Sequence, residues 1–251
     1  MSIPVDVVRR PAVEFVADLQ RRGIRRFFFV FDPHTRRVMA SHDHLQPVAD
    51  FLQADRRDFD GHEGLFYQLN RAGDVLMGAV VHRTVRAQGA GGVRFRQYDT
   101  LESYQRDGLR LARGMTRKNA LARLWWGGGK GVMARLTATA ASTPEARADI
   151  YREYGGFISS LRGCYVTAED VGTTVDVMAY VFSRTRFTTC IPDRFGGSGN
   201  PSVPTARGVV VGVEAALEHA GLGGLRGKSV AIQGVGNVGA PLVGYLFEKG
   251  V

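Results

Sequence analysis

Apolar residues recur at helical spacing in several segments of the chain. In the segment 11–23, Phe15 and Leu19 share one side, a proline opens the segment and a glycine closes it. In a longer polar segment, Asp99 and Glu102 have the spacing of a capping box. Patterns of this kind predict helices over residues 11–23, 45–53, 99–123, 142–154, 173–183, 205–224 and 240–250.

Shorter apolar runs bounded by turn residues predict strands between these helices. Two antiparallel hairpins are expected, one over 25–40 with its turn at Asp32–Pro33 and one over 64–82. Residues 164–174 predict a strand that leaves into a loop, and the apolar run 229–233 predicts a compact buried strand. Mixed strands and helices indicate the α/β class, with a mixed sheet and flanking helices.

The pattern breaks in the segment 188–208, which is rich in glycine, serine and proline. Such a composition is typical of a hinge between domains. We therefore expect one domain over residues 1–195 and the start of another over residues 196–251.

Composition narrows the classes of partner. The 251 residues carry a net charge of +9, but the arginines are scattered and no aromatic residues interleave with them, which argues against nucleic-acid binding. There is no signal peptide and no apolar run of about 20 residues, so a cytoplasmic protein without a membrane partner is expected. The two cysteines have no metal spacing, and the cluster His42–His44 has no further ligand nearby, so no metal is expected.

The segment 229–250 reads as a strand, a glycine loop and a helix. Gly234, Gly236 and Gly239 give the pattern Gly-x-Gly-x-x-Gly, with Asn237 and Val238 between the last two. In this context the glycines allow a tight turn, the approach of a pyrophosphate and close packing of the helix. The pattern therefore predicts a dinucleotide site; a purely structural turn is the alternative.

A second glycine-rich segment carries a lysine. Lys130 follows the run Gly127–Gly129, which predicts a glycine-rich loop; three consecutive glycines are entropically costly, so a functional loop is one interpretation and a bare turn is the alternative. Lys118 precedes it on a predicted helix, where a lysine is usually a solvated surface residue. Asp170, taken alone, would fit a helix cap.

Four blocks in order, "MTRKNALARLWWGGGKGV", "YVTAEDVGTTVDVM", "GGSGNPSVPTARGV" and "VAIQGVGNVG", resemble the signature segments of the Glu/Leu/Phe/Val dehydrogenases, and most of all the leucine and valine branch. The resemblance runs from about His62 to Val251, and residues 1–55 look like a divergent extension. It implies a substrate-binding and dimerisation domain followed by the first strand–helix unit of a Rossmann domain. It also implies an oxidoreductase that forms homo-oligomers and deaminates an L-amino acid with NAD or NADP.

The resemblance also assigns roles to residues. It makes Lys130 the general base and Asp170 the essential carboxylate, and it makes Lys118 the partner of the substrate carboxylate. A substrate-contacting glycine loop is implied at Gly91 and Gly92. The cofactor-binding residues implied are Thr205, Gly234, Gly236, Asn237, Val238 and Gly239.

Some residues depart from the family pattern. Gly131 stands where a threonine commonly follows the lysine, and Ala90 stands where a larger aliphatic residue is common; Ala168 suits an aliphatic pocket. A glutamate-type dehydrogenase and a non-catalytic amino-acid-binding paralogue remain alternatives. The sequence stops 12 residues after Gly239, before the acidic residue expected about 20 residues on. We therefore expect a C-terminally truncated chain that is inactive by itself.

Overall fold

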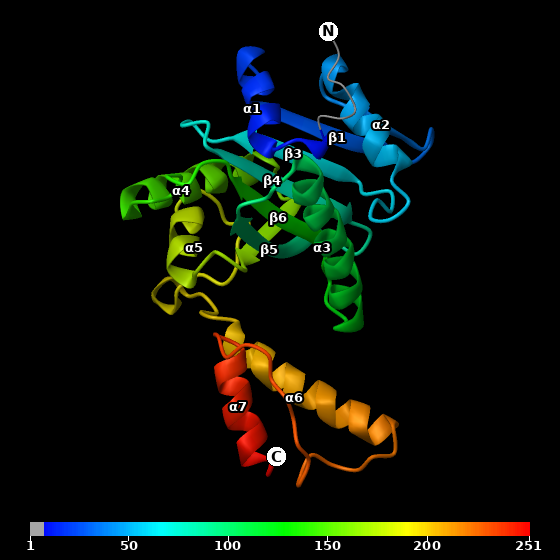
Figure 1. Ribbon diagram of the computed structural model, residues 1–251, viewed down its shortest axis with the longest axis vertical. Coiled ribbons are helices and arrows are strands. Elements are labelled where there is room, and N and C mark those ends of the chain that lie inside the picture. Colours follow the sequence, from blue (N-terminus) through cyan, green and yellow to red (C-terminus); the bar gives the residue numbers. More distant parts are fainter. Residues whose placement is uncertain (1–7) are drawn as a thin grey trace. The chain divides into compact units, whose positions relative to one another are not determined.

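The computed structural model describes residues 8–251, which form two compact units (Figure 1). The first unit extends to Gly197, and the second comprises Ser198–Val251. Each unit has its own hydrophobic core and is described by itself below.

A seven-stranded mixed sheet forms the centre of the first unit. The strand order is β2-β1-β3-β4-β6-β5-β7. Neighbours from β2 to β6 are antiparallel, whereas β5 pairs in parallel with both β6 and β7. The strands are β1 (Arg26–Asp32), β2 (Arg37–Ala40), β3 (Gly64–Leu69), β4 (Val75–Arg83), β5 (Gly89–Arg96), β6 (Gly127–Arg135) and β7 (Tyr165–Glu169). The α/β class, the mixed sheet and both hairpins are thereby confirmed.

The predicted helices of the first unit are also confirmed. They are α1 (Ala12–Arg21), α2 (Gln46–Ala54), α3 (Leu101–Leu121), α4 (Pro144–Ser160) and α5 (Val175–Phe182), with short 3-10 turns η2 (Asp43–Leu45) and η3 (Asp193–Phe195). Threonine side chains cap three of them, at Thr100, Thr143 and Thr174, each accepting a backbone N–H of the first turn.

The predicted cap of α3 was wrong by one residue. Thr100 is the last residue with extended backbone, so its hydroxyl accepts from the N–H of Ser103, whose own hydroxyl accepts from Thr100. Asp99 therefore lies one position too early to cap the helix. Glu102 instead accepts a hydrogen bond from Arg106 at 2.7 Å.

The sheet is buried on both faces by separate hydrophobic clusters. One cluster joins β1 and β3 to residues of α1, α2 and α3, and the other joins β5 and β6 to residues of α4 and α5. The central strand β4 serves both, since Leu76 and Val80 belong to the first cluster and Met77 and Val81 to the second. This alternation follows from the two-residue period of a strand.

The second unit contains α6 (Ser202–His219) and α7 (Gly239–Glu248), which pack through Val210, Leu225 and Leu246. The strand predicted at 229–233 was wrong, because this segment is not paired as a strand and most of it is exposed. A buried parallel strand needs neighbours to satisfy its backbone. Residues 198–251 contain no strand that could pair with it.

Candidate functional site

Lys130 lies in the middle of β6, between β4 and β5, and is 6% exposed. Its side chain shares a strand face with Gly128 and Val132. That face is covered by α3, since a Cβ at Gly128 would lie 1.9 Å from the hydroxyl of Thr116, and Val132 packs near Gly108. The candidate base is therefore held on a rigid, central strand, beneath a helix.

Asp170 follows the last residue of β7. Its backbone N–H donates to the hydroxyl of Thr173 at 2.7 Å, and that hydroxyl donates to the carbonyl oxygen of Asp170 at 2.6 Å and lies 3.3 Å from that of Val93. Gly172 closes the turn with φ +82°, and a Cβ there would lie 2.0 Å from the carbonyl oxygen of Phe95. The turn after β7 is thus fixed against β5.

Lys130 and Asp170 form an ion pair through Nζ and Oδ2. Burial lowers the pKa of Lys130 below its ordinary value, and the charges of Arg94 and Lys118 lower it further, although Asp170 acts in the opposite direction. Burial disfavours the ionised form of Asp170, but Lys130, the backbone N–H of Val171 and Arg94 together outweigh it and leave the pKa of the carboxyl below its usual range. The site therefore places an amine of lowered pKa beside an ionised carboxylate.

The glycines of the two central strands were predicted as loops, and both predictions were wrong. Gly91 and Gly92 belong to β5, and Gly127–Gly129 belong to β6. A Cβ at Gly91 would lie 2.0 Å from the carbonyl oxygen of Gly129. Close packing is therefore what these residues provide to the fold.

Gly92 bears directly on the site. A Cβ at Gly92 would lie 2.8 Å from the Cβ of Asp170 and 2.5 Å from the carbonyl oxygen of Glu169. The glycine thus lets the Asp170 backbone approach β5. Contact of Gly91 and Gly92 with a substrate stays a prediction.

Lys118 lies in the last turn of α3 and is exposed. Among residues 8–251, no acidic side chain forms an ion pair with it. The next residue, Asn119, is buried and donates from Nδ2 to the carbonyl oxygen of Gly127 at 2.7 Å. This bond fixes the end of α3 to the start of β6, and with it the two lysines on their separate elements.

Arg94 was missed by the sequence analysis. It lies on β5 two residues after Gly92, on the same face, and its Nε is 3.6 Å from Oδ2 of Asp170. Its Nη1 donates to both carboxylate oxygens of Asp107 on α3, at 3.1 Å each. Strand alternation would have placed Arg94 beside the site had this segment been recognised as a strand.

The predicted cofactor residues lie in the second unit. Gly234 has φ +86°, and a Cβ at Gly239, where α7 begins, would lie 2.2 Å from the carbonyl oxygen of Gly234. Nothing lies within 4 Å of the Cβ position at Gly236. A tight turn, open space and a helix N-terminus are the features that a pyrophosphate requires. Asn237 is exposed and Val238 partly buried beside them.

Thr205 lies in the first turns of α6. Its hydroxyl donates to the carbonyl oxygen of Pro201 at 2.7 Å. The oxygen lone pairs remain available to accept a hydrogen bond from a ligand amide.

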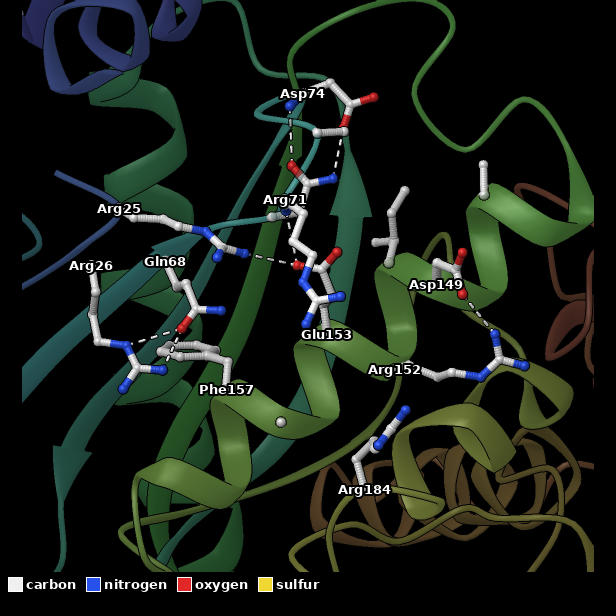
Figure 2. A pocket seen from close by; sticks show the side chains of 15 residues that line it. Arg25, Arg26, Gln68, Arg71, Asp74, Asp149, Arg152, Glu153, Phe157 and Arg184 are labelled. Carbon is white, nitrogen blue, oxygen red and sulfur yellow. Dashed lines mark hydrogen bonds and ion pairs between the residues drawn. The ribbon is translucent and has the colours of Figure 1, made fainter. Parts of the chain in front are cut away.

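A separate pocket of about 700 Å³ lies between α4 and the β1–β3 part of the sheet (Figure 2). Arginines dominate its lining, and Arg25 donates to Glu153 at 3.1 Å. It includes neither Lys130 nor Asp170. Across residues 8–251 no cluster of three metal-ligating side chains is present, and no helix has the length and apolarity to cross a bilayer.

Comparison with known proteins places this geometry in a family. Residues 72–187 match the Glu/Leu/Phe/Val dehydrogenase dimerisation domain, and residues 196–251 match the glutamate/leucine/phenylalanine/valine dehydrogenase domain. The chain belongs to the Glu/Leu/Phe/Val dehydrogenase family.

Its relatives include a leucine dehydrogenase of Geobacillus stearothermophilus, 44% identical over 76% of this chain and 51% of the relative, and a valine dehydrogenase of Streptomyces virginiae, 41% identical over 77% and 53%. The crystal structure of L-tryptophan dehydrogenase from Nostoc punctiforme is 32% identical, with a TM-score of 0.56 over 75% of this chain and 52% of that one. The chain thus spans about half the length of the relatives it matches.

Proposed function

We propose that this protein works as an NAD(P)-dependent dehydrogenase that converts an aliphatic L-amino acid, leucine- or valine-like, to a 2-oxo acid and ammonia. One observation carries the proposal: a buried lysine with a lowered pKa forms an ion pair with a carboxylate on a fixed turn. The names of the relatives at 44% and 41% identity support the substrate class.

In this proposal Lys118 binds the substrate carboxylate. The side chain is exposed, and no acid within the described residues competes for it, so its charge is available to a ligand. A lysine acts here as a compact point charge on a flexible stem. Gly91 and Gly92 would border the same substrate.

Lys130 then acts as the general base. In its neutral form it takes a proton from the substrate ammonium group, which frees the amine lone pair. The nicotinamide, when bound, supplies the acceptor for the hydride that leaves the substrate α-carbon. Asp170 takes a proton from the water that attacks the resulting iminium carbon and returns it to the departing amine.

Gly234, Gly236, Asn237, Val238 and Gly239 would hold the pyrophosphate of the cofactor, and the Thr205 hydroxyl would accept a hydrogen bond from the nicotinamide amide. The positive φ of Gly234 and the open space at Gly236 support this assignment. NAD is the cofactor we propose, with NADP as the alternative.

We further propose a homo-oligomer in the cytoplasm. The family model that matches residues 72–187 is described as a dimerisation domain, and both cysteines are free thiols, which suits a reducing compartment. Light scattering after size-exclusion chromatography tests the assembly.

The activity is tested with the full-length protein by following reduction of NAD and NADP with leucine, valine, phenylalanine and glutamate as substrates. Turnover that is highest with leucine or valine supports the proposal. Turnover only with glutamate would make the enzyme glutamate-type. Binding of amino acids without turnover, by a chain that also binds NAD, would point to a non-catalytic paralogue.

A further inference from the structure

Arg94 stands between two carboxylates at the candidate site. Its Nη1 donates to both oxygens of Asp107, at 3.1 Å each, and its Nε lies 3.6 Å from Oδ2 of Asp170. Tyr98 donates its hydroxyl to Oδ2 of Asp107 at 2.8 Å. These four residues come from β5, the segment after it, α3 and the turn after β7, so long stretches of chain converge on one guanidinium.

The arrangement is anchored on the side away from Asp170. The side chains of Arg94 and Asp107 are only 20% and 22% exposed. The ring of Tyr98 packs edge-on against that of Tyr104, at 5.3 Å between centroids, and Tyr104 is fully buried. Arg94 therefore cannot turn away from Asp170 without giving up hydrogen bonds in a partly desolvated environment.

The Nε of Arg94 is buried and forms no hydrogen bond within the described residues. It points at Asp170, just beyond hydrogen-bond length. In ligand-free enzymes, hydrogen bonds at the reacting groups are often long and shorten when substrate binds. A small movement of Asp170 would complete the hydrogen bond from the Nε of Arg94.

We propose that Arg94, held by Asp107 and Tyr98, is a positioning residue that keeps the Asp170 carboxylate charged and in place while Lys130 is neutral. The inference rests on the proposed function, in which Lys130 loses its charge to act as a base. At that moment Asp170 loses its counterion in a largely buried site, where a lone carboxylate would take up a proton. Arginine keeps its charge at every accessible pH and so replaces the missing counterion.

A direct role for Arg94 in binding the substrate carboxylate fits the structure less well. Its guanidinium already faces two carboxylates, whereas Lys118 forms no ion pair with the described acids. The same cation also acts on the base, since the charge of Arg94 lowers the pKa of Lys130.

The first test measures the titration of Lys130 in the chain as it stands. Lysines are labelled by reductive ¹³C-methylation, and the Lys130 signal is assigned by its loss in Lys130→Arg. In Arg94→Met we expect this signal to titrate at higher pH, because a nearby positive charge is gone. In Asp107→Asn we expect the signal to titrate at lower pH. Without the carboxylate of Asp107, the guanidinium of Arg94 pairs with Asp170 and neutralises its negative charge.

Opposite shifts distinguish positioning from damage to the fold. A disrupted site would expose Lys130 in both variants and move both titrations toward that of an ordinary lysine. Arg94→Lys, which keeps the charge, should stay near the wild-type titration. An unchanged titration in Arg94→Met, or shifts of the same sign in Arg94→Met and Asp107→Asn, would overturn the inference.

The second test is the pH profile of kcat/KM, measured with the full-length enzyme. We expect the rising limb of Arg94→Met to move to higher pH, with a roughly tenfold loss below the limb for each pH unit moved, and KM little changed. If Lys130→Met and Asp170→Asn keep full activity, the proposed function fails, while the Lys130 titration still decides on Arg94.

Discussion

Lys130 and Asp170 form an ion pair, and yet the pKa of the lysine lies below its ordinary value. Burial on a central strand outweighs the attraction of the carboxylate. A surface lysine with the same partner would hold its proton more tightly. The buried position of Lys130 within the sheet is therefore as important for its proposed role as a base as its neighbour Asp170.

Replacing Lys130 should remove the base. In the full-length enzyme we expect Lys130→Met to lower kcat by about 10²–10⁴-fold, the usual contribution of general acid–base catalysis, with a smaller effect on KM. Lys130→Arg keeps a charge beside Asp170 but cannot release its proton, so it should be as inactive as Lys130→Met. Steady-state kinetics of the two variants decide this, and wild-type kcat in either would contradict the role.

The pH dependence follows from the direction of the shift. A base acts when it is deprotonated, so kcat/KM should be low in acid and rise as pH passes the pKa of Lys130. Since burial lowers that pKa, the rise should come at lower pH than for a free lysine. A profile that rises only in the range of an ordinary lysine would show that the site does not lower the pKa of Lys130.

Replacing Lys118 should weaken substrate binding and leave the rate of the chemical step largely unchanged. We expect Lys118→Gln to cost about 2 kcal/mol of binding, roughly thirtyfold in affinity, as for other charged pairs that lose one partner. The loss should vanish for the matching amine, which has no carboxylate. Arg117→Gln on the same helix is the control, since it removes an exposed charge next to Lys118. Equal losses for amino acid and amine would exclude the role.

The glycine run shows where local sequence reasoning failed. Three consecutive glycines have low strand propensity, so Gly127–Gly129 were predicted as a loop. The strand forms because β4 and β5 pair with it on both sides. Its glycines are required because Thr116 of α3 lies close to Gly128 and the Tyr165 ring lies close to Gly129. That pressure comes from residues distant in sequence, and no local pattern reports it.

Two glycine substitutions with opposite expected signs test this explanation. In Gly128→Ala the new Cβ would lie 2.3 Å from the backbone nitrogen of Thr116, so the helix or the strand must shift. We expect a loss of about 1–3 kcal/mol in the free energy of unfolding. In Gly114→Ala, within α3, nothing lies within 4 Å of the new Cβ, and we expect a gain of about 0.5–1 kcal/mol. Denaturant unfolding of both variants measures the difference; a neutral Gly128→Ala would refute the packing argument.

For the candidate site, sequence reasoning selected Lys130 and Asp170, and the structure brings these two together. It passed over Arg94 and Asn119, whose importance depends on which elements become neighbours. The prediction of a strand at 229–233 failed for a related reason, since the composition of a strand does not supply a pairing partner. Residue types that carry chemistry can be recognised in the sequence, but the groups that hold them in place require the fold.

His62 provides a prediction on stability away from the site. It is fully buried, its Nδ1 accepts from the N–H of Asp60 at 3.2 Å, and its Nε2–H donates to the carbonyl oxygen of Leu109 at 2.9 Å. The ring of His82 lies 4.6 Å away, centroid to centroid. Both ring nitrogens are thus used by the neutral tautomer. Burial, helped by the charge of His82, lowers the pKa of His62 to about 3.

Acid should therefore destabilise the first unit through His62. The unfolded chain binds a proton with the ordinary histidine pKa of 6.5, whereas the folded chain does so only near pH 3. Stability is thus fully present above pH 6.5 and falls as pH decreases toward 3, by at most about 5 kcal/mol. We expect His62→Gln to be less stable than wild type at pH 7 but to lose less stability between pH 7 and pH 4. His34→Gln, at an exposed turn, is the matched control and should keep the wild-type slope. Urea unfolding at a series of pH values gives the slopes, and equal slopes for wild type and His62→Gln would show that His62 is not the group responsible.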